Sequence, residues 1–175
     1  MKKFLGYTTI FVLLGIIFFS FNNMFVEQEK EVVVEKESAK TTLVNVYLVE
    51  IDKQNNQSVV PIKRKISKDN IYQNTIEALL EGPDENDLKK GLSTEIPAKT
   101  TLLNIGEYDD LVVVNLSSDF ETGGGSDSMT KRLEQVSNTV SDMTEKPVYL
   151  YINGKEISVL GGDGIMVKQP INVEK

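Results

Sequence analysis

The chain has 175 residues, 40% of them hydrophobic, and it contains neither cysteine nor histidine. This composition excludes disulfides, thiolate zinc sites, a lipid-modified cysteine and a cysteine nucleophile, and it removes the commonest general base. The formal net charge is −7, from 26 acidic and 19 basic residues, so a phosphate backbone would repel the chain and nucleic acid is not an expected partner.

The N-terminus has the pattern of a membrane span. Lys2 and Lys3 precede an uncharged, mainly apolar run from Phe4 to Phe21. A helix of that length, at about 1.5 Å per residue, can cross a hydrocarbon core of roughly 30 Å. The run is longer than the apolar core of a typical signal peptide, and Ser20–Asn23 offers no small-x-small cleavage site. We therefore predict that residues 1–26 form a retained single-pass transmembrane anchor, with a cleaved signal peptide as the alternative.

The charge pattern around this span predicts its orientation. The two lysines favour a cytoplasmic N-terminus, so the rest of the chain is expected to be extracytoplasmic at the cell membrane. Residues 27–40 are highly charged except for Val32, Val33 and Val34, and we interpret them as a solvated stalk. A short extra strand at the three valines is the alternative. Residues 41–175 are the predicted folded domain.

The first half of this domain reads as two strands and a helix. Leu43–Ile51 carries apolar residues on both faces, which predicts a central strand. Residues 60–66 alternate in polarity and predict an edge strand, so we interpret the Lys63-Arg64-Lys65 cluster as edge protection rather than as an anion site. Ser67 is expected to cap a helix that starts near Lys68, with Gly82-Pro83 at its end and a helical turn near residues 85–90.

The second half is predicted to have strands on both sides of a long helix. We predict strands at Thr101–Tyr108 and Leu111–Leu116, then a long helix, and then a hairpin of Val148–Ile152 and Lys155–Val159 with Asn153-Gly154 at its turn. The helix is indicated by apolar residues at spacings of four, three, four and three: Met129, Leu133, Val136, Val140 and Met143. The order β-β-α-β-β-α-β-β predicts an α+β fold with two layers, in which a mostly antiparallel sheet carries two main helices on one face.

Carboxylates flank the three glycines that precede the long helix. Asp119, Glu121 and Asp127 suggest an acid–base pair of the glycosidase kind. The alternative is structural: Ser117 and Asp119 organise a turn, and Ser126 or Asp127 caps the helix. We favour the structural interpretation, because such turns and caps are common.

Other catalytic and binding patterns are incomplete. Gly123–Gly125 could hold an anion on backbone amides, but the Lys-Ser/Thr pair of a phosphate loop is missing. Gly161–Gly164 contains one aspartate, which is too few ligands for calcium. Ser126 and Ser128 have no histidine partner, and nothing supports a dyad of serine with Lys131. We therefore predict no catalytic, cofactor-binding or metal-binding residues, no cofactor, and a protein that is not an enzyme.

Several ordered motifs resemble a known family, the GerMN domain of sporulation and spore germination. They are Val46–Leu48, Ala78–Pro83, Gly91–Pro97, Val113–Phe120 followed by Gly123–Ser126, and Val148–Lys155. The resemblance implies an α+β fold similar to ring-building motifs and a non-enzymatic role in assembling envelope complexes. It supplies no catalytic residues. The chain differs from many members in having one copy of the domain and a membrane span in place of a lipobox cysteine.

The sequence thus predicts a membrane-anchored, non-enzymatic extracytoplasmic module. It would support the assembly of an envelope or sporulation/germination complex through contacts with envelope proteins or with other copies of itself. The alternative is a module that binds peptidoglycan or another envelope polymer, suggested by the glycine loop and by Tyr149 and Tyr151. A wall-cleaving enzyme that uses Asp119 and Glu121 is the third and weakest hypothesis.

Overall fold

The computed structural model describes residues 40–162 and 164–172. The predicted anchor of residues 1–26 and nearly all of the predicted stalk of residues 27–40 lie outside them. The chain divides into the units Met1–Thr41 and Thr42–Lys175, and the fold described below is that of the second unit. Within the described part of the chain, no helix is both long and apolar enough to cross a membrane.

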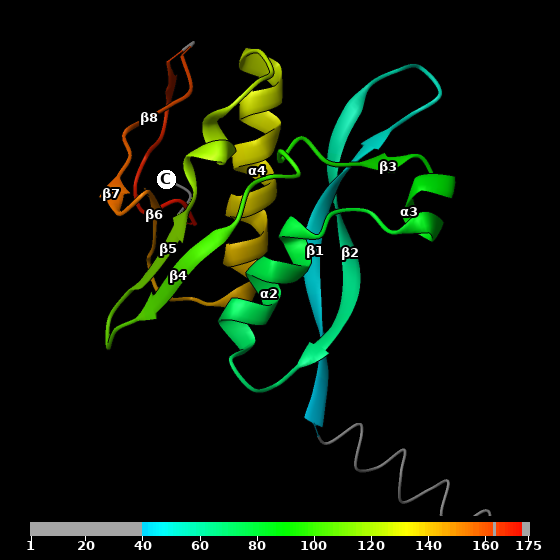
Figure 1. The fold of residues 1–175 in the computed structure, drawn as a ribbon. Helices are drawn as coiled ribbons and strands as arrows, with labels where there is room; N and C mark the ends of the chain where they lie inside the picture. Colours follow the sequence, from blue (N-terminus) through cyan, green and yellow to red (C-terminus); the bar gives the residue numbers. More distant parts are fainter. Residues whose placement is uncertain (1–39, 163, 173–175) are drawn as a thin grey trace, which may run out of the picture. The chain divides into compact units, whose positions relative to one another are not determined.

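The strands of the described residues lie in three sheets (Figure 1). The first sheet has the order β2-β1-β3, the second β4-β5-β6-β7, and the third pairs β8 with β9. The strands are β1 (Thr41–Ile51), β2 (Gln57–Ser67), β3 (Leu92–Ser93), β4 (Leu102–Glu107), β5 (Val112–Leu116), β6 (Val148–Ile152), β7 (Lys155–Glu156), β8 (Val159–Leu160) and β9 (Ile165–Met166). The helices are α2 (Ile71–Leu80), α3 (Glu85–Lys89), α4 (Ser126–Met143) and the short 3₁₀ helix η1 (Ser118–Glu121).

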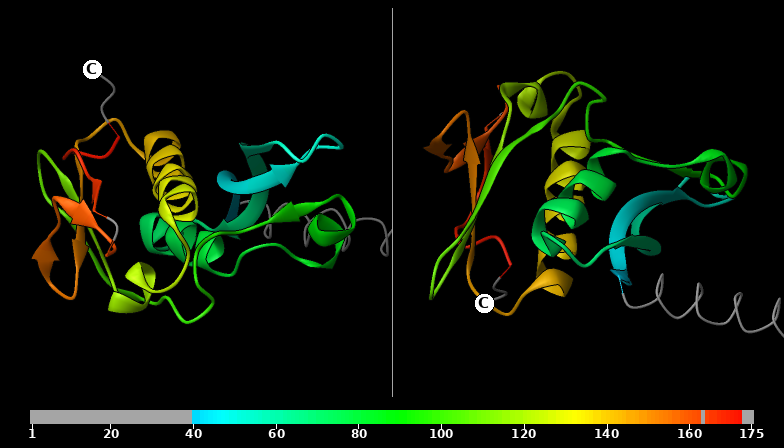
Figure 2. Two further views of the ribbon diagram at one scale, coloured as in Figure 1. Left: turned by 90° about the horizontal axis from the view of Figure 1, so that it is seen from above. Right: turned by 60° about the horizontal axis from the view of Figure 1, so that its bottom comes forward.

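The predicted α+β class, with mostly antiparallel sheets and two main helices packed against them, is confirmed. The strands, however, divide between separate sheets, and α2 and α4 lie between the first sheet and the second (Figures 1 and 2). Helix α2 contacts β2, β4 and α4, and α4 also contacts β2. Strands β5 and β6 pair in parallel, because the chain crosses over through α4 between them.

The core lies between these layers. Alternate residues of β5 and β6 point into it, and the apolar residues of α4 meet them there. The β5 and β6 residues are Val112, Val114, Leu116, Val148, Leu150 and Ile152, all of them buried. On α4, Met129, Val136 and Val140 are buried, while Leu133 and Met143 pack partly buried against the same cluster. The predicted helical stripe is therefore confirmed.

Helix α2 begins later than predicted. It starts at Ile71, and its N-cap is Asn70 in the left-handed region (φ 56°), without a side-chain capping bond. The expected cap by Ser67 and start near Lys68 are therefore wrong. Ser67 Oγ instead accepts a bond from the backbone N–H of Asp69 at 3.2 Å, which closes a turn before the helix. Asparagine tolerates positive φ better than most residues, and this allows the later start.

Three predicted chain reversals are confirmed. Gly82 (φ 73°) follows the end of α2. The Tyr108 N–H donates to the Leu111 carbonyl at 2.8 Å in the β4–β5 turn. Asn153 and Gly154 both have positive φ, 47° and 77°, in the turn between β6 and β7. The helical turn predicted near residues 85–90 is α3.

Strand β2 is an edge strand, as predicted. Pro61, Lys63 and Lys65 are exposed on it. Arg64 does not belong to this exposed set, because it forms an ion pair with Asp87 of α3, whose side chain is 4% exposed. The interpretation of the whole cluster as edge protection is therefore wrong for Arg64, which joins β2 to α3.

Candidate functional site

Helix α4 carries a second stripe of regularly spaced residues beside the apolar one. Ser128, Arg132, Gln135, Thr139 and Asp142 recur at spacings of four, three, four and three. Each precedes a member of the apolar stripe by one residue, a turn of about 100° around the helix. We call this set the polar stripe. Its three central members, Arg132, Gln135 and Thr139, are 2%, 0% and 0% exposed. Buried polar groups require hydrogen-bond partners, and these partners define the site.

Arg132 holds the loop that leads into α4. Its Nη1 donates to the carbonyl of Phe120, and to that of Thr122 at 3.2 Å. Its Nη2 donates to the carbonyl of Gly123 at 3.2 Å, and its Nε to that of Glu95 at 2.9 Å. The guanidinium carbon also lies 5.8 Å from the centre of the Phe120 ring. Burial lowers the pKa of Arg132, an effect that the charge of Glu95 opposes. Since arginine stays protonated in proteins, this is a buried cation bonded largely to main-chain carbonyls.

Gln135 and Thr139 bind the middle of β1. Gln135 Nε2 donates to the carbonyl of Tyr47 at 2.8 Å, and Thr139 Oγ1 accepts from the N–H of Tyr47 at 3.2 Å. Gln135 Oε1 also accepts from the N–H of Glu95 at 2.9 Å. Helix side chains therefore occupy this part of the β1 edge. This explains why β1 does not continue into the second sheet.

Asp142 ends the polar stripe at the surface. Its Oδ2 accepts from the Tyr47 hydroxyl at 3.0 Å and from Asn45 Nδ2 at 2.8 Å. Partial burial, then the hydrogen bond to Asp142 and the charge of its carboxylate, raise the pKa of Tyr47. The stripe thus binds β1 at Asn45 and Tyr47, as well as the segment at Glu95 and the glycine loop.

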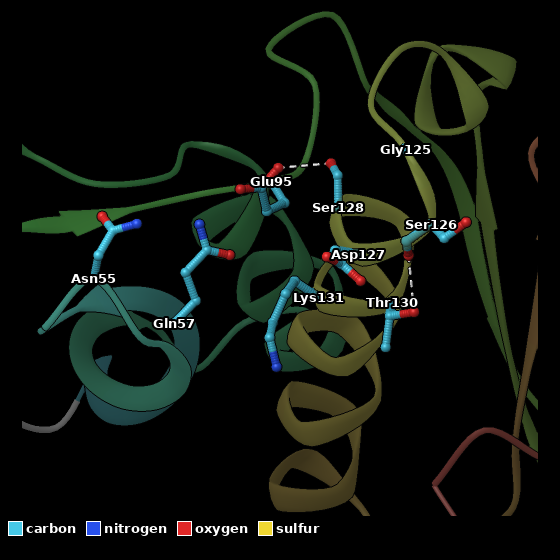
Figure 3. A pocket seen from close by; sticks show the side chains of 9 residues that line it. All are labelled: Asn55, Gln57, Glu95, Gly125, Ser126, Asp127, Ser128, Thr130 and Lys131. Carbon is cyan, nitrogen blue, oxygen red and sulfur yellow. Dashed lines mark hydrogen bonds between the residues drawn. The ribbon is translucent and has the colours of Figure 1, made fainter.

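A hollow of about 770 Å³ lies beside the first turns of α4 (Figure 3). Each lining residue is polar or glycine. The set is Asn55, Gln57, Glu95, Gly125, Ser126, Asp127, Ser128, Thr130 and Lys131, and we call it the polar hollow. In Figure 3, Asn55 and Gln57 lie across from the side chains of α4, with Glu95 between the two walls. Ser128 Oγ donates to Glu95 Oε2 at 2.6 Å.

The predicted acidic residues are distributed between two places. Asp119 and Glu121 lie in η1, where the Ser117 hydroxyl donates to Asp119 Oδ2 at 3.3 Å, so the predicted turn at Ser117 and Asp119 is confirmed. Asp127 lines the polar hollow, and neither Asp119 nor Glu121 does. The predicted cap is wrong: the N-cap is Gly125, without a side-chain bond, because the helix already includes Ser126 and Asp127.

The glycine loop has a definite steric role. Gly124 has φ 78°, and a Cβ atom there would lie 2.5 Å from Ser128 Oγ. Gly123 also has positive φ, 66°, but a Cβ on it would meet nothing within 4 Å. Gly124 therefore keeps the side chain of Ser128 in position against Glu95.

The remaining candidates do not assemble into a catalytic group. Lys131 Nζ lies 2.8 Å from Glu134 Oε2, and Ser128 bonds Glu95, so Lys131 and one of the two serines considered with it, Ser128, have other partners. Within residues 40–162 and 164–172, no cluster of three or more histidine, cysteine, aspartate or glutamate side chains could hold a metal ion. Tyr149 and Tyr151 are half-buried on β6 and do not line the polar hollow.

The sequence interpretation missed Glu95 and the buried members of the polar stripe. The stripe had a visible signal, since Arg132, Gln135 and Thr139 repeat the spacing of their apolar neighbours. Glu95 lies in an irregular segment, where no periodicity marks it.

These features define the class of protein: a small α+β domain of mixed sheets with two main helices packed against them. The chain belongs to the Germane family, described as sporulation and spore germination, whose model matches residues 45–158. The resemblance to GerMN domains is therefore confirmed.

Two solved structures share this fold. The first GerMN domain of the sporulation protein GerM from Bacillus subtilis is 23% identical, with a TM-score of 0.58, over 73% of this chain and 95% of that one. The tandem GerMN domains of the same protein are 22% identical, with a TM-score of 0.56, over 77% of this chain and 47% of that one. This chain thus spans about half of the tandem structure. No curated protein sequence matches it significantly.

Proposed function

We propose that this protein is a membrane-anchored, non-enzymatic module on the outer side of the cytoplasmic membrane. In this role it supports the assembly of an envelope or sporulation/germination complex through contacts with envelope proteins or with other copies of itself. Membership of the Germane family supports the cellular process. The uncharged run from Phe4 to Phe21 supports the anchor.

The observation that carries the proposal is the open edge of β4. This strand ends its sheet and pairs with β5 alone among the described strands. Its sequence, from Leu102 to Glu107, contains no proline and no lysine, and Leu103 is 49% exposed. Tyr108, directly after the strand, is 58% exposed. Natural proteins usually protect such edges, as β2 does with Pro61 and its lysines. Strand β4 has an irregular register between Leu102 and Asn104 and a charged residue, Glu107, at its end, but neither proline nor lysine lies on it, so its edge suits pairing with a partner strand better than that of β2.

Several features support a non-enzymatic role. The chain has no histidine and no cysteine. Ser128 and Lys131 are each engaged with a different carboxylate, and Asp119 lies in a turn bonded to Ser117. Histidine is the commonest base of a hydroxyl or thiol nucleophile, and the chain has none, so Ser128 can have no histidine partner.

Photo-crosslinking in living cells tests the assembly role. A photoreactive amino acid at Leu103 on the β4 edge is expected to give crosslinked adducts, either with envelope proteins or with a second copy. The matched control is the same group at the exposed Lys63 on the protected β2 edge, where we expect few adducts. Equal yields at both positions, or none at Leu103, would contradict a role for β4 in assembly.

The absence of cysteine makes topology straightforward to test. In a Glu156→Cys variant, a membrane-impermeant maleimide has a single reactive thiol on the exposed strand β7. We expect labelling in intact cells. Labelling only after lysis would overturn the extracytoplasmic location.

A second candidate function is binding of peptidoglycan or another envelope polymer. The specific observation in its favour is the polar hollow, whose lining offers hydrogen-bonding groups on two facing walls. Sedimentation of the full-length protein with purified cell wall tests this candidate.

A further inference from the structure

We infer that the polar hollow is a saccharide site, which takes an uncharged glycan segment bearing hydroxyl and acetamido groups. This inference specifies the second candidate function and rests on it. It does not depend on the assembly role of β4.

The lining of the hollow disfavours two other ligand classes, apolar chains and anions. Apart from Gly125, each of its nine residues has a polar side chain, so no aliphatic or aromatic side chain lines it to receive a lipid chain or a hydrophobic peptide. Its charged groups are the carboxylates of Glu95 and Asp127 and the ammonium of Lys131, and Glu134 already neutralises the ammonium at 2.8 Å. The side-chain charges of the lining are therefore negative in sum and disfavour phosphates and other anions, against the opposite effect of the α4 N-terminus.

The two walls match the hydrogen-bonding pattern of a sugar. Each sugar hydroxyl both donates and accepts, and an acetamido group has one donor and one acceptor. Asn55 and Gln57 on one wall can do both, because an amide side chain carries an acceptor oxygen and a donor nitrogen. The carboxylates of Glu95, between the walls, and of Asp127, on the α4 wall, can accept hydrogen bonds. The volume of about 770 Å³ is within the range of small-molecule sites.

Glu95 is fixed before any ligand arrives. Its N–H is bonded by Gln135, its carbonyl by Arg132 and its carboxylate by Ser128. Two of these three partners are buried members of the polar stripe. Glycine at residue 124 leaves room for Ser128 in this position, where a Cβ atom would lie 2.5 Å from Ser128 Oγ. A carboxylate fixed in this way loses little conformational entropy on binding, which is how preorganised sites gain affinity. The carboxylate retains acceptor capacity beyond its bond to Ser128.

Calorimetric titration of the full-length protein in detergent micelles tests the site, with oligomers of N-acetylglucosamine as the probe. We expect saturable binding by the unmodified protein and no binding of heparin, a polyanionic glycan. Glu95→Gln preserves both backbone bonds and is expected to weaken binding about tenfold, because it removes a charged hydrogen-bond acceptor. Gln57→Ala, on the opposite wall and in an exposed position, is expected to weaken binding several-fold. Glu156→Gln makes the same charge change away from the hollow and should bind as the unmodified protein does.

The possible outcomes distinguish a failure of the proposed saccharide site from a failure of the second candidate function, polymer binding. If the unmodified protein and both hollow variants bind the oligomers equally, the oligomers bind outside the polar hollow. The proposed site is then wrong, but polymer binding is still supported. If the protein sediments with cell wall but binds no oligomer, the ligand class is wrong. If it neither sediments nor binds, the inference and the second candidate function fail together. Crosslinking at Leu103 reports on the assembly role separately in each case.

Discussion

Helix α4 presents two neighbouring stripes with the same spacing and opposite chemistry. The apolar stripe joins the central cluster with β5 and β6. The polar stripe bonds β1, the segment at Glu95 and the glycine loop. Apolar burial is non-directional and stabilises in proportion to the area removed from water. Buried hydrogen bonds add little net stability when made, but leaving a partner unsatisfied is expensive. One stripe therefore holds the layers together, and the other fixes where the irregular segments lie.

This difference has a consequence for substitutions. The apolar stripe should tolerate changes that keep its volume, since close packing is its main requirement. The polar stripe should tolerate little, because each of its buried residues satisfies main-chain groups of another segment.

Removing the buried cation gives the largest expected effect. Arg132→Met keeps most of the apolar stem but leaves the carbonyls of Phe120, Thr122, Gly123 and Glu95 without this donor. We expect a loss of about 3–5 kcal/mol in the free energy of unfolding, measured with denaturant. Val136→Ala in the apolar stripe should lose about 2 kcal/mol.

Lys131→Met is the matched control for charge and side-chain length on the same helix. Its head group pairs with Glu134 at the surface, so we expect a change within about 0.5 kcal/mol. If Arg132→Met is tolerated better than Val136→Ala, the assignment of separate roles to the two stripes is wrong.

The glycine loop allows a matched pair of substitutions one residue apart. Gly123→Ala should lose about 1 kcal/mol, because its φ is positive but the space around it is open. Gly124→Ala should lose about 2–3 kcal/mol, because it adds a clash with Ser128 to the same backbone strain. Thermal unfolding of both variants measures the difference. Equal losses would mean that Ser128 moves aside freely, and the fixed position of Glu95 would then be in doubt.

The bond between α4 and β1 is tested by a nearly isosteric change. Thr139→Val removes the acceptor for the Tyr47 N–H at a fully buried position, and we expect a loss of about 1 kcal/mol. Thr130→Val is the control, since Thr130 is exposed and its hydroxyl bonds only the preceding turn of its own helix. A loss for Thr130→Val as large as that for Thr139→Val would show that helix propensity, and not the contact with β1, accounts for the effect.

The two stripes also show what sequence reasoning could reach. The apolar stripe, most strands and the Asn153-Gly154 turn were predictable, because periodicity and turn chemistry are local properties. The polar stripe had the same periodicity, but polar residues on a helix usually face solvent, and the sequence does not show which partners would bury them. The division into separate sheets follows from that burial, since Gln135 and Thr139 occupy the edge of β1.

The candidate site was harder to predict from the sequence than the fold. Asp127 and Gly125 were considered from the sequence, but the polar hollow also needs Glu95 and Asn55, which lie far from them along the chain. Their approach depends on the tertiary contacts of Arg132 and Gln135. The N-caps at Asn70 and Gly125 were missed for a related reason: neighbouring serines and aspartates are better capping residues by type, and backbone geometry decided otherwise.

The smallest expected effect concerns the exposed end of the polar stripe. In the folded protein the pKa of Tyr47 lies above its ordinary value of 10.0, because of partial burial and then Asp142. The protonated tyrosine is thus favoured by folding. The contribution of this preference to the free energy of unfolding is complete below about pH 10. It is lost as the pH rises through the pKa of Tyr47 in the folded protein. The stability difference between the unmodified protein and Tyr47→Phe should therefore narrow in alkaline solution, as followed by denaturant unfolding from about pH 8 to about pH 11.

A second substitution separates the two causes of this pKa shift. Asp142→Asn removes the carboxylate but leaves Tyr47 partly buried, so it should reduce the pH dependence without abolishing it, because partial burial, the largest single cause, remains. A difference that widens with rising pH would mean that folding favours the ionised tyrosine. That result would be incompatible with Asp142 as the hydrogen-bond acceptor, because a carboxylate beside a phenolate is repulsive. The polar stripe would then end at Thr139, and its last turn would act as solvated surface.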